Sequence, residues 1–118
     1  MATYKRSERV ADEIQKELSD IVSRKLRDPS VGMVTITSVK LSDDLKNARI
    51  YYTVMGKNED RSESQRGLTR AVEFFRAELR HRMKLRMIPA LKFFYDDTLA
   101  RSIRVQKLLD EISREHQN

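Results

Sequence analysis

Two neighbouring stretches of alternating residues constrain the fold of this chain more than any other feature. Residues 33–41 (MVTITSVKL) are rich in β-branched side chains, and residues 48–55 (ARIYYTVM) alternate in side-chain type. Both patterns are typical of strands, and the short polar connection between them predicts an antiparallel, hairpin-like pair. A third strand is predicted over residues 91–97 (LKFFYDD). Such a sheet must bury one face, so the rest of the chain has to supply a cover.

The cover is predicted to come from helices, because apolar residues recur elsewhere at steps of three and four. One such stripe begins after Ser7, and RDPSVG (residues 27–32) ends it, since its proline and glycine disfavour a helix. A second helix should begin near Ser62, which forms a capping-box pattern with Gln65, and end before Pro89. The stripe of this helix is Leu68, Val72, Phe75, Leu79 and Met83. A last helix should start at Thr98, with a stripe of Leu99 or Ile103, then Val105, Leu108, Leu109 and Ile112.

These elements predict a single two-layer α+β domain over residues 1–118. We expect the helices on one face of a three-stranded sheet and fraying of residues 113–118. The other face of the sheet should carry every second strand residue, including Tyr51 and Phe94. Exposed aromatic residues of this kind most often serve ordinary packing, and a minority stack on bases or contact a protein.

Positive charge is concentrated in one segment of the chain. The net charge is +6, and residues 61–92 contain nine basic residues against three acidic ones. Since an α-helix turns by about 100° per residue, five of these basic residues fall opposite the apolar stripe, whereas Arg82 and Arg86 project elsewhere. The five residues of this basic row are Arg66, Arg70, Arg76, Arg80 and Lys84. The planar fork of arginine suits phosphate oxygens, so such a row favours a polyanion such as an RNA backbone. A solvated helix face with arginine–glutamate pairs remains the alternative.

Several classes of function are disfavoured. The chain has no cysteine, which excludes disulfides and thiolate metal sites. No run of about eighteen apolar residues is present, and no apolar stretch follows the basic residues near the N-terminus, so we expect a cytoplasmic protein without membrane span or leader. His81 and His116 pair with no nucleophile, and Asp97, which follows Asp96, suits a helix start better than a metal. We therefore expect no catalytic residue, metal or cofactor.

Two segments carry a resemblance to a known family. RDPSVGMVTITSVKLSDDL (residues 27–45) and LRMIPALKFFYDD (residues 85–97) closely resemble the ribosome-binding factor A family of bacterial small-subunit assembly factors. The resemblance implies a type II KH-like fold, in the order helix, strand, strand, helix, helix, strand, plus a C-terminal helix. Ordinary KH domains have a GxxG loop between the paired helices, which this chain lacks. In the family a kink replaces it, usually at an A-x-G sequence, matched here by Ala71, Val72 and Glu73, with Glu73 in place of glycine.

The resemblance also implies a function. Such factors are not enzymes; they bind the free small ribosomal subunit through its rRNA and assist its late maturation, including processing of the rRNA 5′ end. We expect a monomer off the ribosome. The expected rRNA contacts are Arg70, Arg76, Arg80, Arg82, Lys84 and Arg86, and a second, weaker group is Lys5, Arg6, Arg24, Lys25 and Arg27. Charge complementarity at the ends of the first helix is the alternative explanation of that second group.

Two other interpretations stay open. The chain fits a generic KH-like RNA-binding protein without a ribosomal role, and it fits a protein–protein interaction module that uses the open face of the sheet. If the basic row is only an RNA-binding surface, replacing Arg76, Arg80 and Lys84 by glutamate should abolish binding and leave thermal stability almost unchanged.

Overall fold

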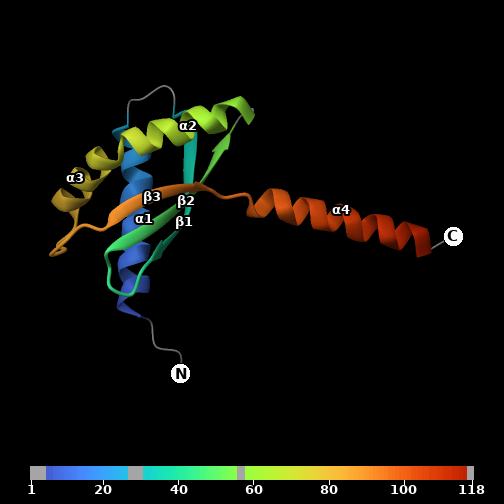
Figure 1. Ribbon diagram of the computed structural model, residues 1–118, viewed down its shortest axis with the longest axis horizontal. Coiled ribbons are helices and arrows are strands. Elements are labelled where there is room, and N and C mark those ends of the chain that lie inside the picture. Colours follow the sequence, from blue (N-terminus) through green and yellow to red (C-terminus); the bar gives the residue numbers. More distant parts are fainter. Residues whose placement is uncertain (1–4, 27–30, 56–57, 117–118) are drawn as a thin grey trace.

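The computed structural model describes residues 5–26, 31–55 and 58–116 of the chain. Its elements follow the predicted order, and the expected α+β, KH-like arrangement is confirmed (Figure 1). They are α1 (Arg6–Arg24), β1 (Met33–Leu41), β2 (Asn47–Met55), α2 (Asn58–Arg70), α3 (Val72–Arg82), β3 (Ala90–Tyr95) and α4 (Thr98–His116).

The three strands form one mixed sheet with β2 in the centre. β1 and β2 are antiparallel, which confirms the predicted hairpin, whereas β3 runs parallel to β2. A parallel neighbour requires a crossover connection, and α2 and α3 provide it. The register of β1 shifts between Ile36 and Ser38, so one extra residue is inserted there. Gly32, just before β1, has a φ of 71°, a left-handed conformation that suits glycine and supplies the predicted turn.

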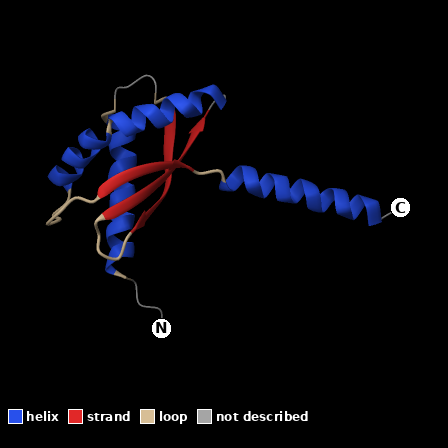
Figure 2. Cartoon of the chain, in the orientation of Figure 1, coloured by secondary structure: helices blue, strands red, loops and turns tan. Residues whose placement is uncertain are grey.

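The core lies between the sheet and the helices α1, α2 and α3, which all pack on the same face of the sheet (Figure 2). Ile14 and Leu18 of α1, Ile50 of β2, and Phe75 and Leu79 of α3 are completely buried. These residues come from the helical and alternating patterns of the sequence, so the predicted core is largely the observed one.

The start of α2 differs from the prediction. The helix already begins at Asn58, so Ser62 lies within it, and the predicted capping box is wrong. The side chain of Gln65 instead accepts a hydrogen bond from the hydroxyl of Tyr52 and donates one of 2.8 Å to the carbonyl of Phe93. Gln65 therefore ties α2 to two strands, and this tertiary role explains its place in the sequence better than a local cap.

The long helical segment is divided at Ala71, as expected for the fold. Ala71 leaves the helical conformation, with φ −88° and ψ 2°, and its N–H is shared between the carbonyls of Gly67 and Leu68. Glu73 occupies the position of the family's glycine, in the first turn of α3. A negative charge at the start of a helix is favourable, so α3 accepts glutamate there without loss of the break.

The last helix departs from the prediction. We expected its apolar stripe to cover the sheet, but α4 extends away from the domain (Figure 1). About half of the surface of each stripe residue is exposed: Ile103, Val105, Leu108, Leu109 and Ile112. The expectation fails because α1, α2 and α3 already occupy the apolar face of the sheet. Residues 113–116, which we expected to fray, are helical, and residues 117–118 lie outside the described residues.

Candidate nucleic-acid interface

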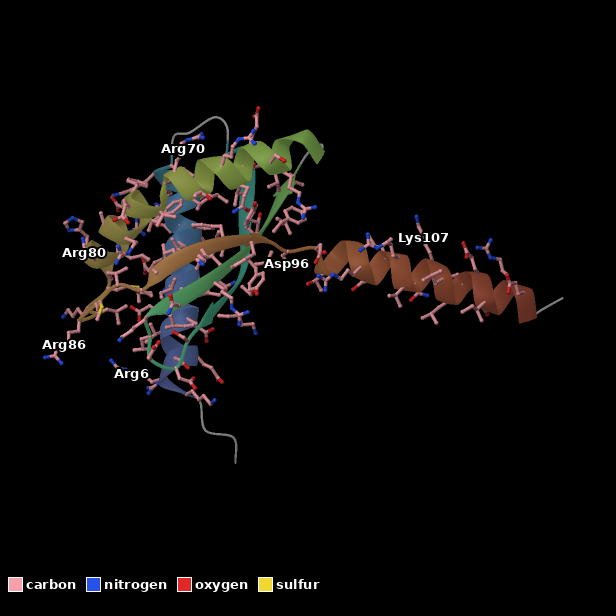
Figure 3. All side chains as sticks on the ribbon, viewed as in Figure 1. Arg6, Arg70, Arg80, Arg86, Asp96 and Lys107 are labelled. Carbon is pink, nitrogen blue, oxygen red and sulfur yellow. The ribbon has the colours of Figure 1, made fainter. Side chains whose placement is uncertain are left out.

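Three exposed cations gather where α3 ends. Arg80 lies in the last turn of α3, and Lys84 and Arg86 lie on the segment that leads to β3. Met83 is buried and Leu85 packs against the core. The alternating residues Lys84 and Arg86 therefore face outward. Arg80 and Arg86 project from the same end of the molecule (Figure 3). No carboxylate of the described residues pairs with any of the three, which we call the α3 cluster.

Arg76 does not belong to that surface. Its side chain is 27% exposed; its Nε donates a hydrogen bond of 3.2 Å to the carbonyl of Pro89, and its Nη2 one of 3.0 Å to that of Ile88. Its Nη1 lies 3.4 Å from the carboxylate of Glu73. The expectation that Arg76 faces solvent with the rest of the basic row is therefore wrong. Helical angles could not reveal that the segment before β3 folds back along α3.

Arg82 is also engaged inside the molecule. Its Nη1 donates hydrogen bonds of 2.7 Å to Asp20 and 3.1 Å to Glu17, both on α1, and its Nε lies 3.7 Å from Glu78. The hydrogen bond from Arg82 is the main reason that the pKa of Asp20 is lowered, and the same bond raises the pKa of Arg82. Arg82 thus fastens α3 to α1, so its predicted role as an rRNA contact loses its structural support.

The remaining predicted contacts are dispersed. Arg70, the last residue of α2, is exposed but projects from another part of the surface than the α3 cluster (Figure 3). Of the second group, Lys5 and Arg6 are exposed at the start of α1, and Arg27 lies outside the described residues.

The basic residues at the other end of α1 have intramolecular partners. Arg24 pairs with Asp20 at 2.7 Å and Lys25 with Glu78 of α3 at 3.2 Å. These ion pairs favour the alternative explanation for the two residues, since they join helix ends to carboxylates of the same chain.

A groove between α2 and the edge strand β3 contains two cations that are not among the expected rRNA contacts, although one of them, Arg66, belongs to the predicted basic row. It is a hollow of about 540 Å³, and its lining includes Arg61 and Arg66 from α2 and Phe94 from β3. The guanidinium of Arg61 lies 3.8 Å from the centre of the Tyr95 ring. A cation on an aromatic face next to an open groove provides both charge and a stacking surface for a nucleotide. No local spacing connects Arg61 with Tyr95, so only the fold reveals this pairing.

The acidic pair before α4 has a structural role. The carboxylate of Asp96 accepts a hydrogen bond of 2.6 Å from the hydroxyl of Thr37 and one of 3.0 Å from the N–H of Thr98, and these bonds lower its pKa. Asp97 pairs with Arg101 at 2.9 Å. The side chain that caps the start of α4 is thus that of Asp96, whereas we expected Asp97.

Neither a metal site nor a membrane-spanning helix is found among residues 5–26, 31–55 and 58–116. Within the described residues, no three histidine, aspartate or glutamate side chains are grouped as metal ligands. In the same part of the chain, no helix is both long enough and apolar enough to cross a membrane.

Comparisons with known proteins agree with this architecture. A sequence model of the ribosome-binding factor A family matches residues 6–109. Ribosome-binding factor A of Nitrosospira multiformis is 44% identical over 108 residues, covering 92% of this chain and 86% of the relative. That of Syntrophus aciditrophicus is 44% identical over 118 residues, covering 100% and 96%.

Solved structures give the same result. The crystal structure of ribosome-binding factor A from Thermus thermophilus superposes with a TM-score of 0.68 at 25% identity, covering 75% of this chain and 93% of that one. A homology model of Thermus thermophilus ribosome-binding factor A, fitted into a cryo-EM map of its complex with 30S, gives a TM-score of 0.62 at 26% identity, covering 73% and 90%. The chain therefore belongs to the ribosome-binding factor A family.

Proposed function

We propose that this chain is a non-catalytic assembly factor that binds the free small ribosomal subunit through its rRNA, with the α3 cluster as a principal contact. The observation that carries the proposal is that Arg80, Lys84 and Arg86 are exposed where α3 ends, without a carboxylate partner among the described residues. The cryo-EM map of a 30S complex with the Thermus thermophilus relative, into which a homology model of that relative was fitted, supports the choice of partner.

Binding energy is the only means of action that this proposal requires. A protein that binds one rRNA conformation more tightly than another shifts the population towards the first, in proportion to the difference in affinity. In this way the factor assists late maturation of the subunit, including processing of the rRNA 5′ end. We also propose that the protein is a monomer when it is not bound to the ribosome, and that it acts in the cytoplasm, where the small subunit is assembled.

Sedimentation with purified ribosomal particles tests the proposal. The protein should associate with free small subunits and much less with assembled ribosomes. A variant with Arg80→Glu, Lys84→Glu and Arg86→Glu should lose this association while remaining folded. The matched control carries Arg104→Glu, Lys107→Glu and Arg114→Glu on α4, which are exposed and, in Figure 3, lie on the helix that points away from the α3 cluster. If both variants associated equally well with free small subunits, the role of the cluster would be refuted. If the unchanged protein bound assembled ribosomes as tightly as free small subunits, a generic RNA-binding protein would be favoured.

A further inference from the structure

The sheet face opposite α1, α2 and α3 carries a row of three cations, one from each strand. Lys40 of β1 pairs in register with Arg49 of β2, and Arg49 pairs with Lys92 of β3. All three are exposed. Because neighbouring strands lie about 4.8 Å apart, the three side chains leave the sheet within roughly 10 Å of one another. The extra residue in β1 is what brings Lys40 to this face, while the neighbouring Val39 is buried.

An aromatic pair lies beside this row. Two residues further along β2 and β3, and therefore on the same face, Tyr51 pairs in register with Phe94. Their ring centres are 5.7 Å apart and their planes are inclined by 31°. Phe94 is 40% exposed and Tyr51 is half-buried, so the rings offer part of their surface to solvent. We call Lys40, Arg49, Lys92, Tyr51 and Phe94 the sheet platform.

The strand residues on this face of the sheet carry positive charges and no negative ones. The strand residues on this face are Met33, Thr35, Ser38, Lys40, Asn47, Arg49, Tyr51, Thr53, Met55, Ala90, Lys92 and Phe94, and none of them is acidic. Carboxylates of the described residues lie only at the margins of this face: Glu8, Asp12 and Asp43 line a hollow of about 410 Å³ together with Lys40 and Arg49, and Asp96 and Asp97 line one of about 340 Å³ next to Tyr51. Asp96 is already bound to Thr37 and Thr98, and Asp97 to Arg101.

We propose that the sheet platform binds an unpaired segment of RNA, with bases stacked on Tyr51 and Phe94 and phosphates held by Lys40, Arg49 and Lys92. A cationic row beside aromatic rings is the combination that single-stranded nucleic acid recognises, because only unpaired bases expose their faces for stacking. A duplex would use the cations but not the rings. An acidic protein segment would likewise leave the rings without a specific partner.

The groove between α2 and β3 supports this choice of ligand. Phe94 lines that groove as well as the platform, and Lys92 lines a neighbouring hollow between α2 and β3. A single strand therefore has a continuous path from the groove, past the edge strand, onto the open face. The proposal does not depend on the α3 cluster, which lies at the end of a helix on the other side of the sheet.

Binding of a short RNA without any ribosomal particle tests the platform. The probe is a fluorescent, uridine-rich single strand of about ten nucleotides, within the usual site size, and its comparison is the same strand annealed to a complement. The variant Tyr51→Leu with Phe94→Leu keeps an apolar surface but removes the rings. We expect it to bind the single strand at least tenfold more weakly, with an unchanged salt dependence. The variant Lys40→Gln, Arg49→Gln, Lys92→Gln should instead flatten the slope of log affinity against log salt by about 2.

The controls separate this proposal from the one above. The triple glutamate variant of the α3 cluster should still bind the short strand, even though it loses the small subunit. Loss of oligonucleotide binding in that variant, or unchanged binding when the two rings are removed, would overturn the platform. Equal affinity for the annealed probe would overturn it too, since stacking would then play no part. Thermal unfolding of each variant verifies that it is folded under the assay conditions.

Discussion

The guanidinium of Arg82 donates a hydrogen bond of 2.7 Å to the carboxylate of Asp20, so the last turn of α3 is fastened to α1. The side chain of Arg82 is 21% exposed and also contacts Glu17 and Glu78. One arginine thus forms ion pairs with three carboxylates from two helices. This makes Arg82 a structural residue within a segment whose composition suggests RNA binding throughout.

Replacing Arg82 by glutamine should lower the thermal midpoint by a few degrees, because Glu17, Asp20 and Glu78 would lose the cation that they share. Asp20 and Glu78 would keep only their more exposed partners, Arg24 and Lys25. Binding of small subunits by the folded protein should stay unchanged. The matched control is Arg24→Gln, which removes another partner of Asp20; that partner lies on the same helix and is largely exposed, so little change is expected. Thermal unfolding and sedimentation measure the two effects. A loss of binding larger than the loss of folded protein would make Arg82 an RNA contact.

Arg76 and Arg80 should respond oppositely to the same substitution. Arg76→Gln removes two hydrogen bonds to the carbonyls of Ile88 and Pro89, so we expect a loss of about 1–2 kcal/mol in the free energy of unfolding. Arg80→Gln changes an exposed side chain and should stay within about 0.5 kcal/mol. Denaturant unfolding distinguishes them. The hydrogen bonds of Arg76 therefore correct the sequence-based expectation that replacing Arg76 together with Arg80 and Lys84 leaves thermal stability almost unchanged.

The salt dependence of small-subunit binding should report the α3 cluster residue by residue. Each phosphate contact that is lost should flatten the slope of log affinity against log salt by roughly 0.9. We expect this change for Arg80→Gln, Lys84→Gln and Arg86→Gln separately, and none for Arg76→Gln, whose donors are used within the protein. Titrations at several salt concentrations provide the slopes. Identical slopes for all four variants would contradict the assignment.

Asp96 should give the protein a defined sensitivity to acid. The hydroxyl of Thr37 and the N–H of Thr98 hold the pKa of Asp96 below its usual value of 3.8. The stabilisation from the ionised carboxylate is thus fully present above about pH 4 and is lost as the pH falls through the lowered pKa. The difference in stability between the wild type and Asp96→Asn should be constant near neutral pH and shrink below about pH 4. Unfolding measured from pH 7 to pH 2 tests this, and a difference that grows on acidification would contradict it.

Local patterns predicted the elements well and tertiary relationships poorly. The alternation of residues 33–41 and 48–55 specified both strands, and the stripe around Phe75 specified the buried side of α3. Helical angles alone could not show that Arg76 is engaged within the protein and Arg80 is exposed. The segment before β3 returns along one side of α3 and contacts Arg76 there. The basic row of the sheet platform depends on the register of three strands and on one inserted residue, and neither is encoded in local spacing.

The same distinction between pattern and packing predicts how the two apolar stripes respond to truncation. Leu79 of α3 is completely buried, whereas Leu108 of α4 is 59% exposed. Leu79→Ala should cost about 2–5 kcal/mol, since it removes core contacts and leaves a cavity. Leu108→Ala should change stability by less than about 0.5 kcal/mol, because its side chain meets mostly water. Both variants replace leucine by alanine within a helix, so helix propensity is the same in each case and the difference isolates burial. A loss at Leu108 comparable with that at Leu79 would mean that α4 packs on the domain or on a second molecule in solution, and sedimentation equilibrium would separate those two cases.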